Sequence, residues 1–99
     1  MQKIGVVYIM TNPKNTVLYT GVTSNIAMRV LQHRTHAILR SFTAKYNCTK
    51  LVWYKSFESI VEAIAEEKRL KGGSRRQKID LINNFNPEWN DLWDEIRNS

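Results

Sequence analysis

A pair of short apolar runs near the N-terminus, separated by a turn sequence, restricts the fold of this chain more than any other feature. Residues 6–10 and 17–21 are rich in Val, Ile and Tyr, which favour β-strands. The segment between them contains Asn12-Pro13. Both residue types favour turns, because Pro fixes φ and Asn tolerates turn geometry. The pattern therefore predicts a β-hairpin.

This hairpin places two tyrosines on the same face of the sheet. If Met10 lies opposite Val17, then Tyr8 lies opposite Tyr19, and directly opposite residues share a face. The two rings can form an ordinary cross-strand aromatic pair. Alternatively, the phenols can face a cleft and serve as proton acceptor and hydrogen-bond donor. Gly21 would let another group approach the backbone closely.

The rest of the chain indicates one more strand and four helices. Residues 50–57 are predicted as the third strand, and helices are predicted over residues 26 to about 37, 59–71 and 74 to about 83. Gly72-Gly73 ends the second helix and Ser74 caps the third. Asn86-Pro87 is predicted to start the last helix, with Asn as cap and Pro at its first position. The order β-β-α-β-α-α-α predicts one small α+β domain over residues 1–99.

Composition and charge narrow the classes of protein and partner. The chain has 99 residues, of which 42% are hydrophobic, and no apolar stretch approaches the ~20 residues that a membrane helix needs. A single cysteine excludes an internal disulfide and a Cys-rich zinc site, and it favours the reducing cytoplasm. The net charge is +6, and residues 1–50 contain seven basic residues and no acidic one. This asymmetry favours a phosphate-bearing partner such as nucleic acid, although a generally basic surface gives the same composition.

One acidic residue, Glu67, lies where the helical pattern expects an apolar side chain. At about 100° per residue, Glu67 falls inside the stripe formed by Ile60, Ala63, Ile64 and Leu70. A carboxylate on that side is costly to desolvate unless it gains a cation, a hydrogen-bond network or water. A divalent metal is one candidate partner. An internal salt bridge, or a position at the wet edge of the stripe, is the structural alternative.

The first predicted helix carries a basic pair. Arg29 and His33 are spaced i, i+4, so they are neighbours on the helix surface. A guanidinium beside an imidazole suits a phosphate oxyanion, and the imidazole can move a proton near neutral pH. Two solvated side chains give the same spacing. Arg29 is also a candidate cation for lowering the pKa of a nearby phenol.

Further basic residues form a candidate surface for a phosphate backbone. They gather around the Gly72-Gly73 break, and one more stands between Phe42 and Tyr46, where the aromatic rings can stack. A solvated basic helix junction is the alternative. Trp89 and Trp93, at i, i+4, favour helix packing over base stacking. The candidate nucleic-acid-binding residues are Lys45, Lys68, Lys71, Arg75, Arg76 and Lys78.

Taken in order, these motifs resemble the GIY-YIG nuclease superfamily, and in particular its small stand-alone, single-domain members. The resemblance covers residues 6 to about 92. The first motif has Val-Val-Tyr in place of Gly-Ile-Tyr and the second Tyr-Thr-Gly in place of Tyr-Ile-Gly, so both keep the tyrosine. The segments that carry the resemblance are Val7-Tyr8-Ile9, Leu18-Tyr19-Thr20-Gly21, Arg29-x-x-x-His33, Glu67-x-x-x-Lys71 and Asn86-Pro87.

The resemblance implies a three-stranded antiparallel sheet flanked by helices and metal-dependent hydrolysis of nucleic-acid phosphodiesters. It implies that Tyr8, Tyr19, Arg29, His33 and Glu67 are catalytic, with Glu67 holding Mg²⁺ or Mn²⁺. It further implies that Gly21 and Asn86 order the site.

The expected function is thus a DNA endonuclease that nicks as a monomer, with selection of branched structures as one option. Three points stay open. They are the identity of the tyrosine that acts as the base, the choice between DNA and RNA as the substrate, and a role in DNA repair, recombination or mobile-element maintenance. Two alternatives also stay open: a non-catalytic nucleic-acid-binding module on the same fold, and a small protein-interaction adaptor using Trp89 and Trp93.

Overall fold

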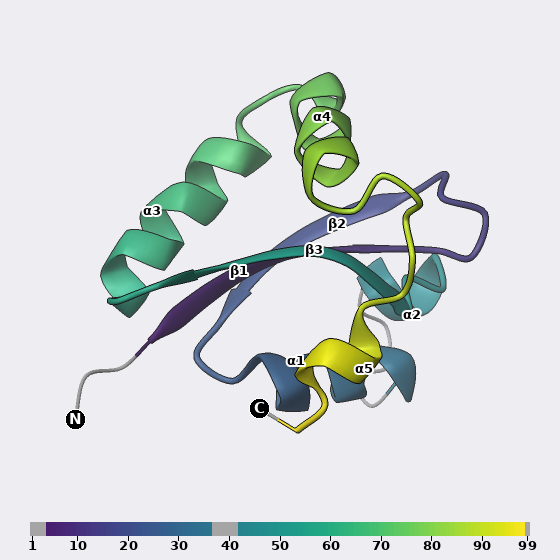
Figure 1. Ribbon diagram of the computed structural model, residues 1–99, viewed down its shortest axis with the longest axis horizontal. Coiled ribbons are helices and arrows are strands. Elements are labelled where there is room, and N and C mark those ends of the chain that lie inside the picture. Colours follow the sequence, from purple (N-terminus) through teal and green to yellow (C-terminus); the bar gives the residue numbers. More distant parts are fainter. Residues whose placement is uncertain (1–3, 37–41, 99) are drawn as a thin grey trace.

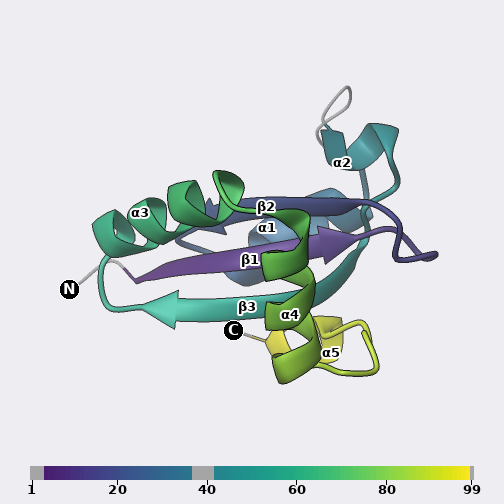
Figure 2. The ribbon, with the colours of Figure 1, turned by 90° about the horizontal axis from the view of Figure 1, so that it is seen from above.

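The computed structural model describes residues 4–36 and 42–98, and its centre is a three-stranded antiparallel sheet in the order β2-β1-β3. Helices α3 and α4 cover one face of the sheet, and α1, α2 and α5 lie on the other (Figures 1 and 2). The predicted α+β class with helices flanking the sheet is confirmed. The elements are β1 (Gly5–Thr11), β2 (Leu18–Thr23), α1 (Ile26–Arg34), α2 (Phe42–Lys45), β3 (Lys50–Phe57), α3 (Ile60–Lys71), α4 (Arg75–Phe85) and α5 (Trp93–Ile96).

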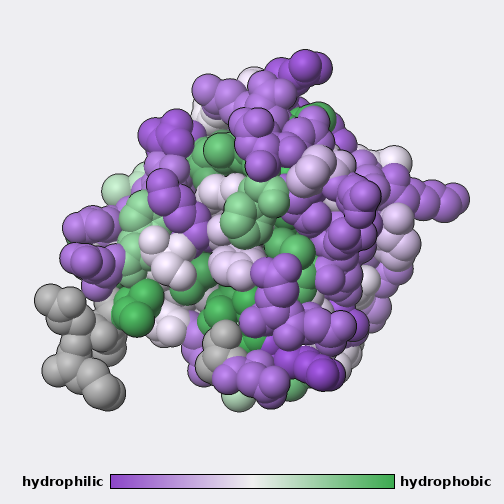
Figure 3. Space-filling view, viewed as in Figure 1, coloured by the Kyte–Doolittle hydropathy of each residue, from purple (hydrophilic) through white to green (hydrophobic). Residues whose placement is uncertain are grey.

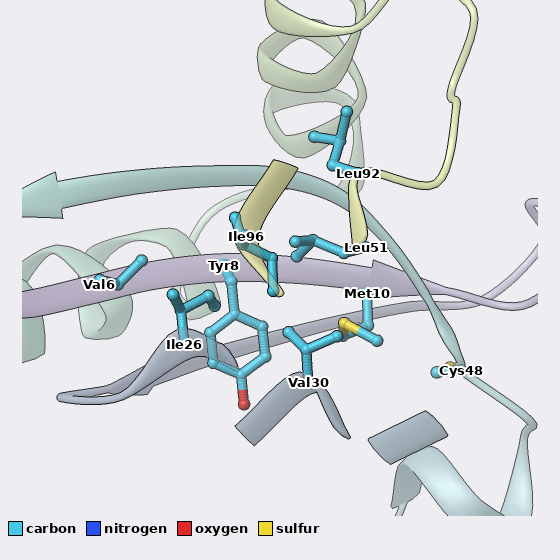
Figure 4. Close-up of a cluster of buried hydrophobic side chains, with 9 residues drawn as sticks. All are labelled: Val6, Tyr8, Met10, Ile26, Val30, Cys48, Leu51, Leu92 and Ile96. Carbon is cyan, nitrogen blue, oxygen red and sulfur yellow. The ribbon is translucent and has the colours of Figure 1, made fainter. Parts of the chain in front are cut away.

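The central strand β1 is buried along its whole length because helices cover both of its faces. Its side chains alternate between two apolar clusters. Val7 and Ile9 pack under α3 and α4, whereas Val6, Tyr8 and Met10 pack against α1 and α5. Figure 4 shows the second cluster, in which the hydroxyl of Tyr8 points away from the sheet toward α1.

The hairpin forms, but its register differs by two residues from the predicted one. Met10 lies opposite Tyr19, and Tyr8 lies opposite Gly21. The loop has the predicted length but lies one residue further along the chain, at residues 12–17, where the Asn12 side chain accepts hydrogen bonds from the backbone N–H groups of Thr16 and Val17 at 2.8 and 3.0 Å. A shift of two residues preserves the face, so both tyrosines still lie on the same side of the sheet.

Local capping chemistry sets the helix starts, and the predicted cap Ser74 is confirmed. The side chains of Asn25, Ser59 and Ser74 each accept a hydrogen bond from the first turn of α1, α3 and α4. Ser74 forms a complete capping box with Gln77. Helix α1 ends at Arg34, and the predicted extension to about residue 37 reaches positions outside the described residues.

Two predictions about helices are wrong. The four-residue helix α2 lies between α1 and β3, where no helix was predicted. Asn86 does not start the last helix but ends α4, because its backbone N–H donates to Ile82 O at 2.7 Å. The chain then crosses to β3, where Leu92 N–H donates to Leu51 O at 2.8 Å, and the last helix begins only at Trp93.

The two edges of the sheet differ in character. The view of Figure 1 looks onto the β3 edge, and apolar side chains lie across the middle of that face (Figure 3). The β2 edge lies on the opposite side, between α3 and the pair α1 and α2 (Figure 2). Over the part of the chain that the structure describes, no helix is both long and apolar enough to cross a membrane.

Candidate active site at the β2 edge

A chain of buried hydrogen bonds joins β1, α1 and α2 on the face of the sheet that α1 covers. The Tyr8 hydroxyl on β1 lies 2.9 Å from Nε2 of His33 on α1. The other ring nitrogen, Nδ1, lies 2.8 Å from the hydroxyl of Thr43 on α2. Tyr8 is 1% exposed and His33 is 4% exposed. Both partners of the imidazole are hydroxyls, so this buried chain can relay a proton.

Gly21 makes room for the Tyr8 side chain. Tyr8 lies opposite Gly21 in the hairpin, and its ring crosses β2 at that position. A Cβ atom at residue 21 would lie 2.4 Å from the Tyr8 hydroxyl oxygen, closer than any real contact allows. The missing side chain therefore lets the phenol of Tyr8 reach the β2 edge.

Tyr19 lies beside this pair but is more accessible. Its ring centroid is 6.3 Å from that of Tyr8 and 5.4 Å from that of His33. On its other side it stacks on Phe42 at 5.9 Å, and Phe42 packs against Tyr46 at 4.6 Å. Phe42 and Tyr46 are 46% and 41% exposed. The rings thus form a row that leads from the buried site to the surface.

Burial and neighbouring charges set the protonation states. Burial raises the pKa of Tyr8, and the nearby Tyr19 adds to this effect, as does the Glu67 carboxylate to a smaller extent; Arg29 opposes it. Burial, assisted by the Arg29 charge, lowers the pKa of His33 to about 4. At neutral pH, Tyr8 is therefore a phenol and His33 a neutral imidazole.

Arg29 is the cation of this cluster. It is half-buried, and its charge acts on both Tyr8 and His33. Among residues 4–36 and 42–98 its side chain forms no hydrogen bond or ion pair. A guanidinium with no partner among these residues is available to an anion that enters the site.

Glu67 is the acidic residue at this edge. Its side chain is 13% exposed, as the inward position predicted, and it forms an ion pair with Lys71 at 3.0 Å. Its influence on the pKa of Tyr8 places it within electrostatic reach of the phenol. Within the described residues, no group of three or more His, Cys, Asp or Glu could hold a metal ion. A divalent cation at Glu67 would therefore have few carboxylate ligands and would keep several waters.

The predicted basic residues differ in their surroundings. Lys71 and Lys78 line a shallow hollow of about 290 Å³ together with Leu18, Tyr19, Thr20 and Phe42. Lys45 lies over the Tyr46 ring at 5.3 Å. Lys68 is exposed on α3.

The two arginines have protein partners. Arg75 donates to Thr16 O at 2.9 Å, and Arg76 forms an ion pair with Asp80 at 3.2 Å. The two lysines of the hollow therefore lie against the Tyr19 end of the aromatic row, and Lys45 lies against its Tyr46 end.

Asn86 lies on the far side of the sheet from this cluster. Its amide donates to Val52 O at 3.1 Å and to Asn90 O at 2.8 Å, and its carbonyl accepts from Asn90 N–H at 3.2 Å. These bonds hold the turn after α4 against β3. Sequence reasoning missed the contact of Thr43 with His33. The signal for α2, the helix that contains Thr43, was the aromatic pair Phe42 and Tyr46 at i, i+4.

Comparison with known proteins supports the arrangement. The family model described as the GIY-YIG catalytic domain matches residues 4–80. The UPF0213 protein SH2523 of Staphylococcus haemolyticus (strain JCSC1435) is 36% identical over 80 residues, which cover 77% of this chain and 90% of that protein. A UPF0213 protein of Syntrophus aciditrophicus (strain SB) is 34% identical over 82 residues, 83% of this chain and 92% of that protein.

A solved structure has the same fold. The solution NMR structure of the UPF0213 protein BH0048 from Bacillus halodurans matches with a TM-score of 0.56 and 26% identity. The match covers 90% of this chain and 93% of that one.

Proposed function

The chain belongs to the GIY-YIG catalytic domain family, a nuclease family, and on that premise we propose that it is a divalent-metal-dependent endonuclease that hydrolyses phosphodiester bonds in DNA. The observation that carries the proposal is the hydrogen bond of 2.9 Å between Tyr8 and a neutral, buried His33. Any buried tyrosine hydroxyl needs a hydrogen-bond partner, but a neutral imidazole is a partner that can also accept its proton.

The proposed reaction begins with proton transfer along the buried chain. A water molecule attacks the scissile phosphorus and gives its proton to the Tyr8 oxygen. Tyr8 passes its own proton to His33 Nε2, and the P–O bond to the leaving group breaks. The leaving oxygen then takes a proton from solvent, and the protonated His33 releases its extra proton to solvent, which restores the neutral imidazole. In this scheme Tyr8 never has to exist as a stable phenolate, which agrees with its raised pKa.

The other residues of the cluster position the substrate. Arg29 donates to the phosphate oxygens and stabilises the charge of the transition state. Tyr19, at the accessible end, orients the water or the phosphate. Glu67 would hold Mg²⁺ or Mn²⁺, and this ion would neutralise charge on the scissile phosphate and leaving oxygen.

The basic surface would bind the DNA strand. Lys71 and Lys78, in the hollow beside Tyr19, would contact a phosphate near the scissile one. Lys45, Lys68, Arg75 and Arg76 would extend this contact with the backbone. With one site per chain, a monomer would nick one strand in each encounter.

One observation favours a second candidate, a nucleic-acid-binding module without catalysis. The ion pair with Lys71 occupies the carboxylate that would have to hold the metal. If this pair persists when DNA binds, the basic surface remains functional and the metal site does not form.

Cleavage assays separate the two candidates. Purified protein is incubated with branched, flapped and plain duplex DNA in the presence of Mg²⁺, Mn²⁺ or EDTA. The proposal expects metal-dependent nicks that are lost in Glu67→Gln and retained in Glu66→Gln, a matched control on the same helix that pairs with Arg69 instead. Salt-sensitive binding without nicks at any metal concentration supports the binding module and refutes the nuclease.

A further inference from the structure

The short helix α2 places a threonine hydroxyl against the histidine of the relay. Thr43 is 2% exposed, and its Oγ1 atom lies 2.8 Å from His33 Nδ1. The backbone around it is fixed, because Cys48 N–H donates to Thr43 O at 2.8 Å and Tyr46 N–H donates to Phe42 O at 3.0 Å. Cys48 is itself part of the buried core. The hydroxyl is thus held in place by packing and by its backbone.

The two hydroxyls beside the imidazole leave two possible tautomers. A neutral imidazole has one N–H donor and one acceptor nitrogen. If Nδ1 carries the proton and donates to Thr43, then Nε2 is free to accept from Tyr8. If Nε2 carries the proton, it donates to the Tyr8 oxygen, and the phenol then has no acceptor in His33. Only the first tautomer lets Tyr8 hand over its proton.

We propose that Thr43 is a positioning residue that keeps His33 in the Nδ1–H tautomer, with Nε2 turned to the Tyr8 hydroxyl. The choice of this tautomer rests on the proposed nuclease function, whereas its measurement does not depend on activity. When His33 gains a second proton, the Nδ1–H bond to Thr43 stays in place, so the ring does not have to reorient during the transfer. Thr43 thereby links α2 to the chemistry without touching the substrate.

The tautomer can be read directly by NMR. Protein with ¹⁵N-labelled histidine is measured at pH 7 through long-range ¹H–¹⁵N couplings, and His33→Gln identifies the signals because His36 is the other histidine. We expect Nδ1–H in the wild type and in Thr43→Ser, which keeps the hydroxyl. In Thr43→Val, a variant of similar shape without a hydroxyl, we expect a mixture with Nε2–H. A wild-type Nε2–H tautomer, or a Val variant that leaves the signals unchanged, overturns the proposal.

Kinetics provide the second measurement. We expect Thr43→Val to lower kcat for nicking by about tenfold or more with little change in KM for the DNA, and Thr43→Ser to restore it. Equal loss in both variants, or a loss confined to KM, contradicts a positioning role. The amide spectrum of each variant reports whether it is folded. Absence of nicking by the wild type would refute the nuclease proposal alone, since the NMR result still decides the tautomer.

Discussion

Acidification to pH 5 is expected to destabilise the fold through His33, because this imidazole is buried without a negative partner. Its pKa is lowered from 6.5 to about 4 in the folded protein, while the unfolded chain keeps the ordinary value. Between these two values the unfolded chain binds more protons, so the free energy of unfolding rises with pH through this window. The full difference corresponds to about 3 kcal/mol, and the change between pH 7 and pH 5 to about 2 kcal/mol.

Urea denaturation at pH 7 and pH 5 measures this effect in the wild type and in His33→Gln. The variant keeps a polar side chain but does not titrate, and both proteins share all other titrating groups. We expect the wild type to lose about 2 kcal/mol more than the variant on acidification. Equal losses, within about 0.5 kcal/mol, would show that His33 is not held as a neutral imidazole and would refute the reasoning on the relay.

Two further predictions follow from the site. Gly21→Ala places a Cβ atom 2.4 Å from the Tyr8 hydroxyl, so we expect urea denaturation to show a loss of about 1–3 kcal/mol and the cleavage assay to show a loss of nicking; an unchanged stability contradicts the close approach. Lys71→Met removes the partner of Glu67, so we expect calorimetry to show that Mn²⁺ binds the free protein up to about fivefold more tightly, while DNA binds more weakly. Lys68→Met is the control, because it removes the same charge from the exposed side of α3. Equal effects of the two variants on Mn²⁺ affinity would show that the gain comes from the lower net charge and not from the loss of the ion pair.

The sheet and the helix starts could be predicted because they depend on local chemistry. β-Branched and aromatic runs predicted the strands, and Ser74 marked the start of α4 through its side-chain cap. The prediction that Tyr8 and Tyr19 share a face was correct although the register was wrong by two residues, because side chains alternate with a period of two. The inward position of Glu67 followed from helical periodicity in the same way.

The features that failed depend on individual contacts that composition and periodicity do not assign. The hairpin register depends on the Asn12 side chain, which accepts hydrogen bonds from two backbone N–H groups of the loop. Helix α2 is only four residues long, too short for a periodic pattern. Asn86-Pro87 has the composition of a helix start, but the bonds of Asn86 to Val52 and Asn90 direct the chain into a turn along β3. The hydrogen bonds of His33 to Tyr8 and Thr43 likewise connect residues that only the fold brings together.

Paramagnetic broadening by Mn²⁺ tests most directly whether a cation binds beside the buried relay. Substoichiometric Mn²⁺ is added to ¹⁵N-labelled protein, and the loss of amide signals maps the bound ion in the wild type and in Glu67→Gln. The account predicts broadening centred on α3 around Glu67 and on β2 around Tyr19, and its disappearance in the variant. Broadening centred instead on the acidic C-terminal segment with Asp91, Asp94 and Glu95, and unchanged in Glu67→Gln, would contradict it.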